Sequence, residues 1–137
     1  MYILFDEQII DSEEIRDLIE KNSDFKVERD MCKASKREDV LAYLLTLDAE
    51  IVKAQIKEEY DLQNIDIEEL FEEYMSISEE RAMELEDLMP MYSIMTSRSY
   101  KLDMTENKIK TIIVAAHTDL GLLKLNDVLN RLLSATD

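Results

Sequence analysis

KREDVLAYLLTLDAEIVKAQIKEEY, residues 36–60, carries the strongest apolar periodicity of the chain. Its apolar residues recur three, four and seven positions apart, a spacing that places side chains on one face of an α-helix. This stripe consists of Leu41, Leu44, Leu45, Ile51, Val52, Ile56 and Tyr60. We therefore predict one long central helix from about residue 36 to residue 60.

Shorter segments on both sides of this helix repeat the helical pattern. Four predicted helix starts have Asp or Ser followed three residues later by Glu, the spacing of a capping box; they begin at Asp11, Asp66, Ser76 and Asp103. The chain has one glycine and one proline, so it offers little of the usual material for tight hairpin turns. We predict an all-α fold, an irregular bundle of five to six helices that forms a single helical domain over residues 1–137.

Two segments near the N-terminus leave room for strands. YILF, residues 2–5, is a short apolar run, and residues 25–31 alternate apolar with polar side chains in a pattern that is broken at Arg29. Alternation with a period of two is typical of a half-buried strand. A small N-terminal two-stranded element therefore remains an alternative within the helical prediction.

Negative charge is concentrated in the middle of the chain. The 32 acidic and 16 basic residues give a net charge of −16, and residues 58–89, called here the acidic block, hold 13 acids and one base. Several of these acids are like-charged helical neighbours, such as Glu68 with Glu72 and Glu80 with Glu84. Each such pair costs a helix about 0.2–0.5 kcal/mol. A sequence selected only for helix stability would place lysines at some of these positions.

We interpret the acidic block as a docking surface for a basic protein, which such a surface would attract and select. Six of the eight methionines lie between residues 75 and 104, and flexible methionines suit a surface that repacks around a partner. The predicted partner-binding residues are Glu68, Glu69, Glu72, Glu73, Glu80, Glu84 and Asp87, with Met89 and Met91 as apolar anchors. The partner expected from charge is a nucleic-acid-handling protein that this chain inhibits or regulates, as a DNA mimic or an immunity protein does.

Two other interpretations of the same features remain open. The chain is alternatively a structural or scaffolding subunit that self-associates through the apolar faces of its terminal helices, with a merely solvated acidic face. A helix-turn-helix over residues 12–48, with Arg29, Lys33, Lys36 and Arg37 as its basic patch, is disfavoured by the net charge. The same charge opposes direct binding of nucleic acid or anionic lipid, because both require basic residues against phosphates.

The sequence lacks the residue combinations on which most catalytic and metal sites depend. His117 is the only histidine, and DLQNIDIEELFE, residues 61–72, has Asp66 where a calcium-binding EF-hand loop requires glycine. We therefore predict no enzyme activity, no cofactor and no metal site. Cys32 is the only cysteine, no apolar run is long enough to span a membrane, and no secretory signal pattern opens the chain. These features favour a cytoplasmic location.

Overall fold

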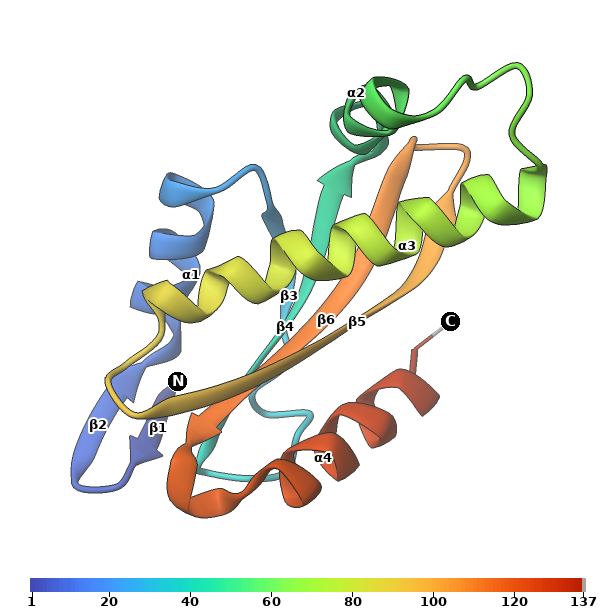
Figure 1. Ribbon diagram of the computed structural model, residues 1–137. Coiled ribbons are helices and arrows are strands. Elements are labelled where there is room, and N and C mark those ends of the chain that lie inside the picture. The colour runs from blue at the N-terminus through green and yellow to red at the C-terminus, as the bar shows by residue number, and fades with distance from the viewer. Residues whose placement is uncertain (137) are drawn as a thin grey trace.

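The computed structural model describes residues 1–136 and shows a mixed α/β fold (Figure 1). Within this range the chain forms four α-helices and six strands in two antiparallel sheets, with 44% of residues helical and 32% in strands. The predicted all-α bundle is therefore wrong. A two-stranded sheet pairs β1 with β2, and a four-stranded sheet has the order β3-β4-β6-β5.

The elements follow one another with few long connections. The strands are β1 (Tyr2–Phe5), β2 (Gln8–Asp11), β3 (Lys26–Asp30), β4 (Val40–Asp48), β5 (Ser93–Asp103) and β6 (Lys108–His117). The α-helices are α1 (Ser12–Asn22), α2 (Ala49–Glu59), α3 (Ile67–Met83) and α4 (Leu122–Ser134). Two short 3-10 helices, η1 (Glu84–Leu88) and η2 (Thr118–Leu120), precede β5 and α4.

The predicted central helix over residues 36–60 divides at Asp48 into a strand and a helix. β4 lies in the middle of the sheet, and its side chains alternate between two separate cores, with Leu45 in one and Leu44 in the other. A strand buried on both faces has a nearly continuous apolar sequence, so it also satisfies a helical spacing. Asp48 then caps α2, because its side chain accepts a hydrogen bond from the backbone N–H of Glu50. The helical prediction is confirmed only for the second half of the segment.

The predicted helix after Asp103 is a strand for the same reason. β6 pairs with β4 over nine residues and with β5 on its other side, and most of its side chains are buried. Asp103 accepts hydrogen bonds from the backbone N–H groups of Thr105 and Glu106, as a helix cap would, but it does so in the turn between β5 and β6. The hydrogen-bond pattern that predicted a helix start at Asp103 therefore belongs to a hairpin turn.

Scarcity of glycine does not prevent tight turns in this chain. Asp6, in the turn between β1 and β2, has a φ of 55°, and Asn107, at the end of the turn between β5 and β6, has a φ of 57°. Asp and Asn tolerate this left-handed conformation better than most residues. Strands do form at both predicted N-terminal segments, but β1 pairs with β2, whereas β3 joins the larger sheet.

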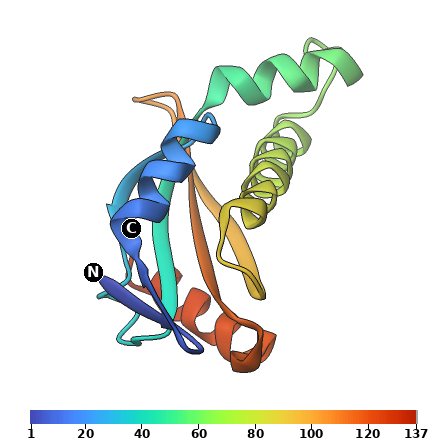
Figure 2. The same cartoon turned by 90° about the vertical axis from the view of Figure 1, so that its left-hand side faces the viewer.

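Helices cover both faces of the four-stranded sheet. The larger core lies on the face covered by α1, α2 and α3, and the smaller core lies under α4 (Figures 1 and 2). At the end of the sheet opposite the β1–β2 hairpin, α2 and the loop that follows it extend beyond the strands (Figure 2). None of the helices within residues 1–136 has the length and apolar character that crossing a membrane requires.

A chain of buried hydroxyl groups holds α3 against the sheet. Ser78 Oγ lies 2.6 Å from Ser99 Oγ on β5, which lies 2.7 Å from Thr111 Oγ1 on β6. Beside this chain, Glu79 accepts a hydrogen bond of 2.9 Å from the backbone N–H of Ser99. These contacts fix the position of α3 along the sheet, and with it the position of the acidic side chains on the outer face of the helix.

Candidate functional site

The predicted contact carboxylates all lie on α3 and the adjoining η1, and we call this group the α3 acidic surface; it consists of Glu68, Glu69, Glu72, Glu73, Glu80, Glu84 and Asp87. Six of the seven are exposed, and Glu73 is half-buried. The opposite side of α3 is occupied by buried residues such as Tyr74, Ile77 and Ala82. None of the seven carboxylates forms an ion pair within residues 1–136.

The last turn of α3 carries charges that oppose the helix dipole. Glu80 lies in this turn and Glu84 is the C-cap, where the exposed carbonyl groups make negative charge unfavourable. Arg81 is the one base of the acidic block, and its Nη1 lies 3.7 Å from Asp24, while its Nε donates to Gln55. Arg81 is therefore directed toward Asp24 and α2, and Arg98 on β5 pairs with Glu79, so neither of these bases pairs with the surface carboxylates.

Tyr60 reports the negative field beside the N-terminal half of α3. Its pKa is raised above the ordinary value of 10.0, first by the charge of Glu73, then by partial burial, and then by Glu59 and Glu69. The Tyr60 hydroxyl also approaches Glu73 Oε1 at 3.5 Å, which is a weak contact. The carboxylates thus act together at this point, although α2 and α3 are separate helices.

The two predicted methionine anchors lie in different surroundings. Met89 is only 8% exposed and belongs to the larger core, so its side chain is not part of the surface. Met91 is exposed, but it lies in the connection to β5, beside Tyr92 and His117. The methionines between residues 75 and 104 therefore do not form a single surface stripe.

An apolar groove that the sequence did not predict adjoins the α3 acidic surface. It encloses about 450 Å³ between α2, α3 and the turn from β5 to β6, and its lining is Glu50, Lys53, Ile67, Leu70, Phe71, Tyr74, Leu102, Met104 and Asn107. Ile67 is 82% exposed, Phe71 45% and Met104 79%. The groove is missed because its three walls are far apart in the sequence. Its one local signal is the apolar spacing of residues 67–74.

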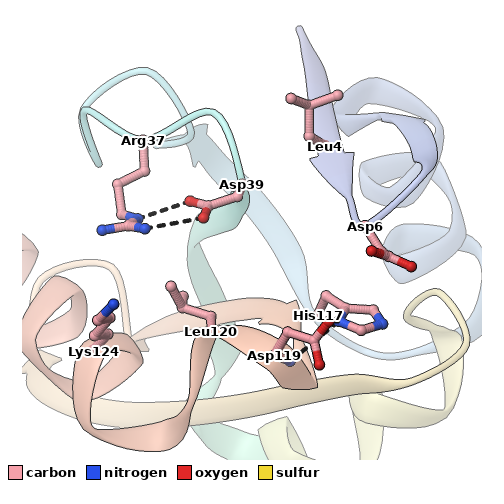
Figure 3. A pocket seen from close by; sticks show the side chains of 8 residues that line it. All are labelled: Leu4, Asp6, Arg37, Asp39, His117, Asp119, Leu120 and Lys124. Carbon is pink, nitrogen blue, oxygen red and sulfur yellow. Dashed lines mark hydrogen bonds and ion pairs between the residues drawn. The ribbon is translucent and has the colours of Figure 1, made fainter.

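A second depression is polar and lies at the opposite end of the sheet (Figure 3). It encloses about 390 Å³, and its lining is Leu4, Asp6, Arg37, Asp39, His117, Asp119, Leu120 and Lys124. Arg37 and Asp39 form a two-pronged pair, with Nε–Oδ1 at 2.7 Å and Nη2–Oδ2 at 3.0 Å. This pairing raises the pKa of Arg37 and lowers that of Asp39. Arg37 and Asp39 thereby neutralise each other, whereas Asp6, Asp119 and Lys124 lie outside this pair.

His117, at the end of β6, has two contacts at Nδ1 that exclude each other. The backbone N–H of Asp119 donates to Nδ1 at 3.1 Å, which requires an unprotonated nitrogen, whereas Asp119 Oδ2, at 3.4 Å, would accept a proton from it. The amide contact is the shorter one, so the neutral ring with its proton on Nε2 fits the geometry. Tyr92 packs edge to face against the ring at 6.4 Å. The imidazole is therefore held by structural contacts.

The polar depression and Cys32 bear on catalytic chemistry, and the carboxylates bear on metal binding. The eight residues that line the polar depression include no serine, threonine or cysteine that would act as a nucleophile. Cys32 is buried, and burial raises the pKa of its thiol to about 12, so it remains a protonated core residue at neutral pH. Residues 1–136 hold no cluster of three or more His, Cys, Asp or Glu side chains placed to bind a metal ion.

Comparison of the chain with protein-family models, with curated proteins and with solved structures finds no match.

Proposed function

We propose that this chain is an acidic binding module that docks through the α3 acidic surface onto a basic protein, one that handles nucleic acid, and inhibits or regulates it. The observation that carries the proposal is the set of seven carboxylates on one helical segment with no ion-pair partner within residues 1–136. A binding role is proposed in place of catalysis, and the proposed location is the cytoplasm.

The arrangement of charge favours association with another molecule over a purely solubilising role. Solubility requires only a net charge away from zero, which acids spread over the whole surface would supply. Here, like charges are neighbours on α3, and Glu80 and Glu84 also oppose the helix dipole. A basic partner would offset both costs when it binds. Its long-range attraction would also increase the rate of encounter.

The burial of the terminal helices bears on the alternative of a self-associating scaffold subunit. That alternative requires free apolar faces on the terminal helices. In α1, Ile15 and Ile19 are buried, and in α4 the residues Leu125, Val128 and Leu129 are buried against the sheet. Leu18 on α1 and Leu122 and Leu123 on α4 stay exposed, but most of both apolar faces is already buried in the fold, and we favour the docking role.

The test compares two variants that remove the same number of charges. The α3 triple variant is Glu72→Gln, Glu80→Gln and Glu84→Gln, and the control triple variant is Glu7→Gln, Glu38→Gln and Asp127→Asn; all six residues are exposed. Wild type and both variants are immobilised, exposed to extract of the native host at low ionic strength, and eluted with a salt step. The eluted proteins are identified and quantified by mass spectrometry.

We expect a basic protein to be retained by wild type and by the control triple variant, and to be lost or strongly reduced with the α3 triple variant. Elution by salt is expected because the interaction between exposed charges is screened. Equal retention of the same proteins by all three chains would contradict the proposal. Retention of no basic protein by wild type would also contradict it.

A further inference from the structure

Beyond the acidic surface itself, the apolar groove between α2, α3 and the β5–β6 turn has the features of a binding site. Its apolar residues Ile67, Phe71 and Met104 are large and remain exposed in the isolated chain. A volume of about 450 Å³ falls within the roughly 300–1,000 Å³ typical of ligand sites. Exposed apolar patches that are rimmed by polar residues commonly mark sites of interaction.

We infer that this groove binds a basic amphipathic helix of the partner, an inference that rests on the proposed function. The helical form follows from the spacing of the groove residues on α3. Ile67, Leu70, Phe71 and Tyr74 recur at positions i, i+3, i+4 and i+7 and form one apolar stripe. Such a stripe presents ridges and grooves that accommodate the apolar side chains of a second helix.

Negative charge on the elements that form the groove defines the other face of this ligand helix. Glu68 and Glu72 follow Ile67 and Phe71 on α3, and Glu50 lines the groove from α2. Lys53 is the only base among the lining residues. A helix that buries leucine-like side chains in the groove would therefore place lysine or arginine beside these three carboxylates. A second copy of this chain fits poorly, because it would bring the same carboxylates together.

Two of the three walls of the groove are joined to one another by hydrogen bonds in the isolated chain. The backbone N–H of Ala49 donates to the carbonyl of Asn107 at 2.9 Å, and Asn107 Nδ2 donates to Glu50 Oε1 at 3.0 Å. These bonds tie the start of α2 to the β5–β6 turn. A site that is already formed loses less conformational entropy on binding, which favours affinity.

The inference is tested with two synthetic peptides of identical leucine and lysine composition. In the first, leucines occupy positions i, i+3, i+4 and i+7 of a helix, and in the second the order is scrambled so that no apolar face forms. Binding to the full chain is measured by fluorescence anisotropy at low ionic strength, and the bound surface is mapped by amide chemical shifts. The groove variant is Ile67→Ser with Met104→Ser, and the matched control is Met91→Ser with Leu123→Ser. All four substituted residues are highly exposed, so folding is preserved.

We expect the amphipathic peptide to bind wild type and the matched control with similar affinity, and the groove variant at least about tenfold more weakly, as for loss of apolar anchors. The scrambled peptide should bind weakly to all three chains, and shifts should centre on residues 67–74. Equal binding of both peptides with no effect of the groove variant would overturn the groove inference while leaving acidic docking intact. Failure of the amphipathic peptide to bind wild type would overturn it too, and the capture experiment then decides the proposed function separately.

Discussion

The helices α3 and α4 lie on opposite faces of the same sheet and differ in how completely their apolar stripes are covered (Figure 1). In α4, the stripe of Leu125, Val128, Leu129 and Leu132 is at most 3% exposed, and only its first residue, Leu122, is exposed. In α3, the stripe is buried from Tyr74 onward, but its first residues border the groove and stay exposed. The same spacing of apolar residues thus belongs to a buried packing surface in most of α4 and to a partly exposed one at the start of α3.

The two interfaces also differ in chemistry. Under α4, the core is an apolar cluster, and Arg131 near the end of the helix donates one hydrogen bond to the carbonyl of Ser35. Under α3, the hydroxyl chain of Ser78, Ser99 and Thr111 crosses the interface. Apolar packing tolerates sliding more readily than directional hydrogen bonds do. The difference indicates that α3 is held at a defined position while half of its stripe and most of its outer face stay available.

The largest effect is expected from truncation of the covered stripe. Leu129→Ala should lower the free energy of unfolding by about 2–5 kcal/mol, because it leaves a cavity in the core beneath α4. Leu123→Ala, at an exposed position of the same helix, should change it by no more than about 0.5 kcal/mol. Urea unfolding followed by circular dichroism measures both values. Similar effects at the two positions would mean that α4 is not packed as described.

An intermediate effect is expected at the hydroxyl chain under α3. Ser99→Ala removes the central hydroxyl and leaves Thr111 Oγ1 without its buried partner, at a cost of about 1–3 kcal/mol. The adjacent exposed residue Arg98, changed to Ala, provides the comparison and should cost less than 1 kcal/mol, since its pair with Glu79 is at the surface. Equal stability of Ser99→Ala and wild type in urea would show that the hydroxyl chain does not hold α3.

A small effect is expected from truncation of the open stripe. Phe71→Ala should lower the free energy of unfolding by about 1 kcal/mol or less, although Phe71 is larger than Leu129, because nearly half of its side chain already contacts water. Phe71→Ala and Leu129→Ala can be measured in the same urea unfolding series. If Phe71→Ala lowered the free energy of unfolding as much as Leu129→Ala, the start of α3 would be a structural interface. The groove would then not be a free binding site.

The smallest effect on stability is expected from lowering the pH from 7 to 5. Burial acts to raise the pKa of Asp30, but hydrogen bonds from Ser12 and from the backbone N–H of Cys32 outweigh it and leave the pKa below 3.8. A carboxyl group with a lowered pKa stabilises the fold above its unfolded-state pKa, and this contribution is lost as pH falls through the folded-state value. Thermal melts should therefore change little from pH 7 to 5 and decline below about pH 4. Asp30→Asn should reduce the decline; a steep loss already at pH 5–6 would contradict this.

The contrast between the two helices also explains what the sequence could predict. α1 and α4 lie where helices were expected, because each has one apolar face and one polar face. The helix start predicted at Ser76 is wrong, because α3 runs through this residue from Ile67 to Met83. β4 and β6 were mistaken for helices because burial on both faces removes the alternation that identifies a strand. Asp6 and Asn107 adopt the positive φ that tight hairpin turns use, so these turns form without glycine, which the composition alone did not predict.

The candidate site was predictable where it depends on a single segment. The α3 acidic surface was found because charge spacing along one helix is visible in the sequence. Met89 was included because the sequence does not reveal that the turn after η1 directs this residue into the core. The groove could not be found, since Glu50, Phe71 and Met104 come together only through the sheet pairing and the packing of α3 on the sheet. Distant contacts of this kind carry no local signal.

The unfolding free energy of the α3 triple variant tests whether the acidic surface is kept for a partner at a cost to the fold. Replacing Glu72, Glu80 and Glu84 with Gln removes the two i,i+4 like-charge pairs, Glu68 with Glu72 and Glu80 with Glu84, and two carboxylates near the helix C-terminus. In urea at pH 7 and low salt, we predict a variant that equals wild type or exceeds it by up to about 1 kcal/mol. A loss of more than 1 kcal/mol, with no such loss in the control triple variant, would show that these carboxylates serve the fold itself and would contradict the proposal.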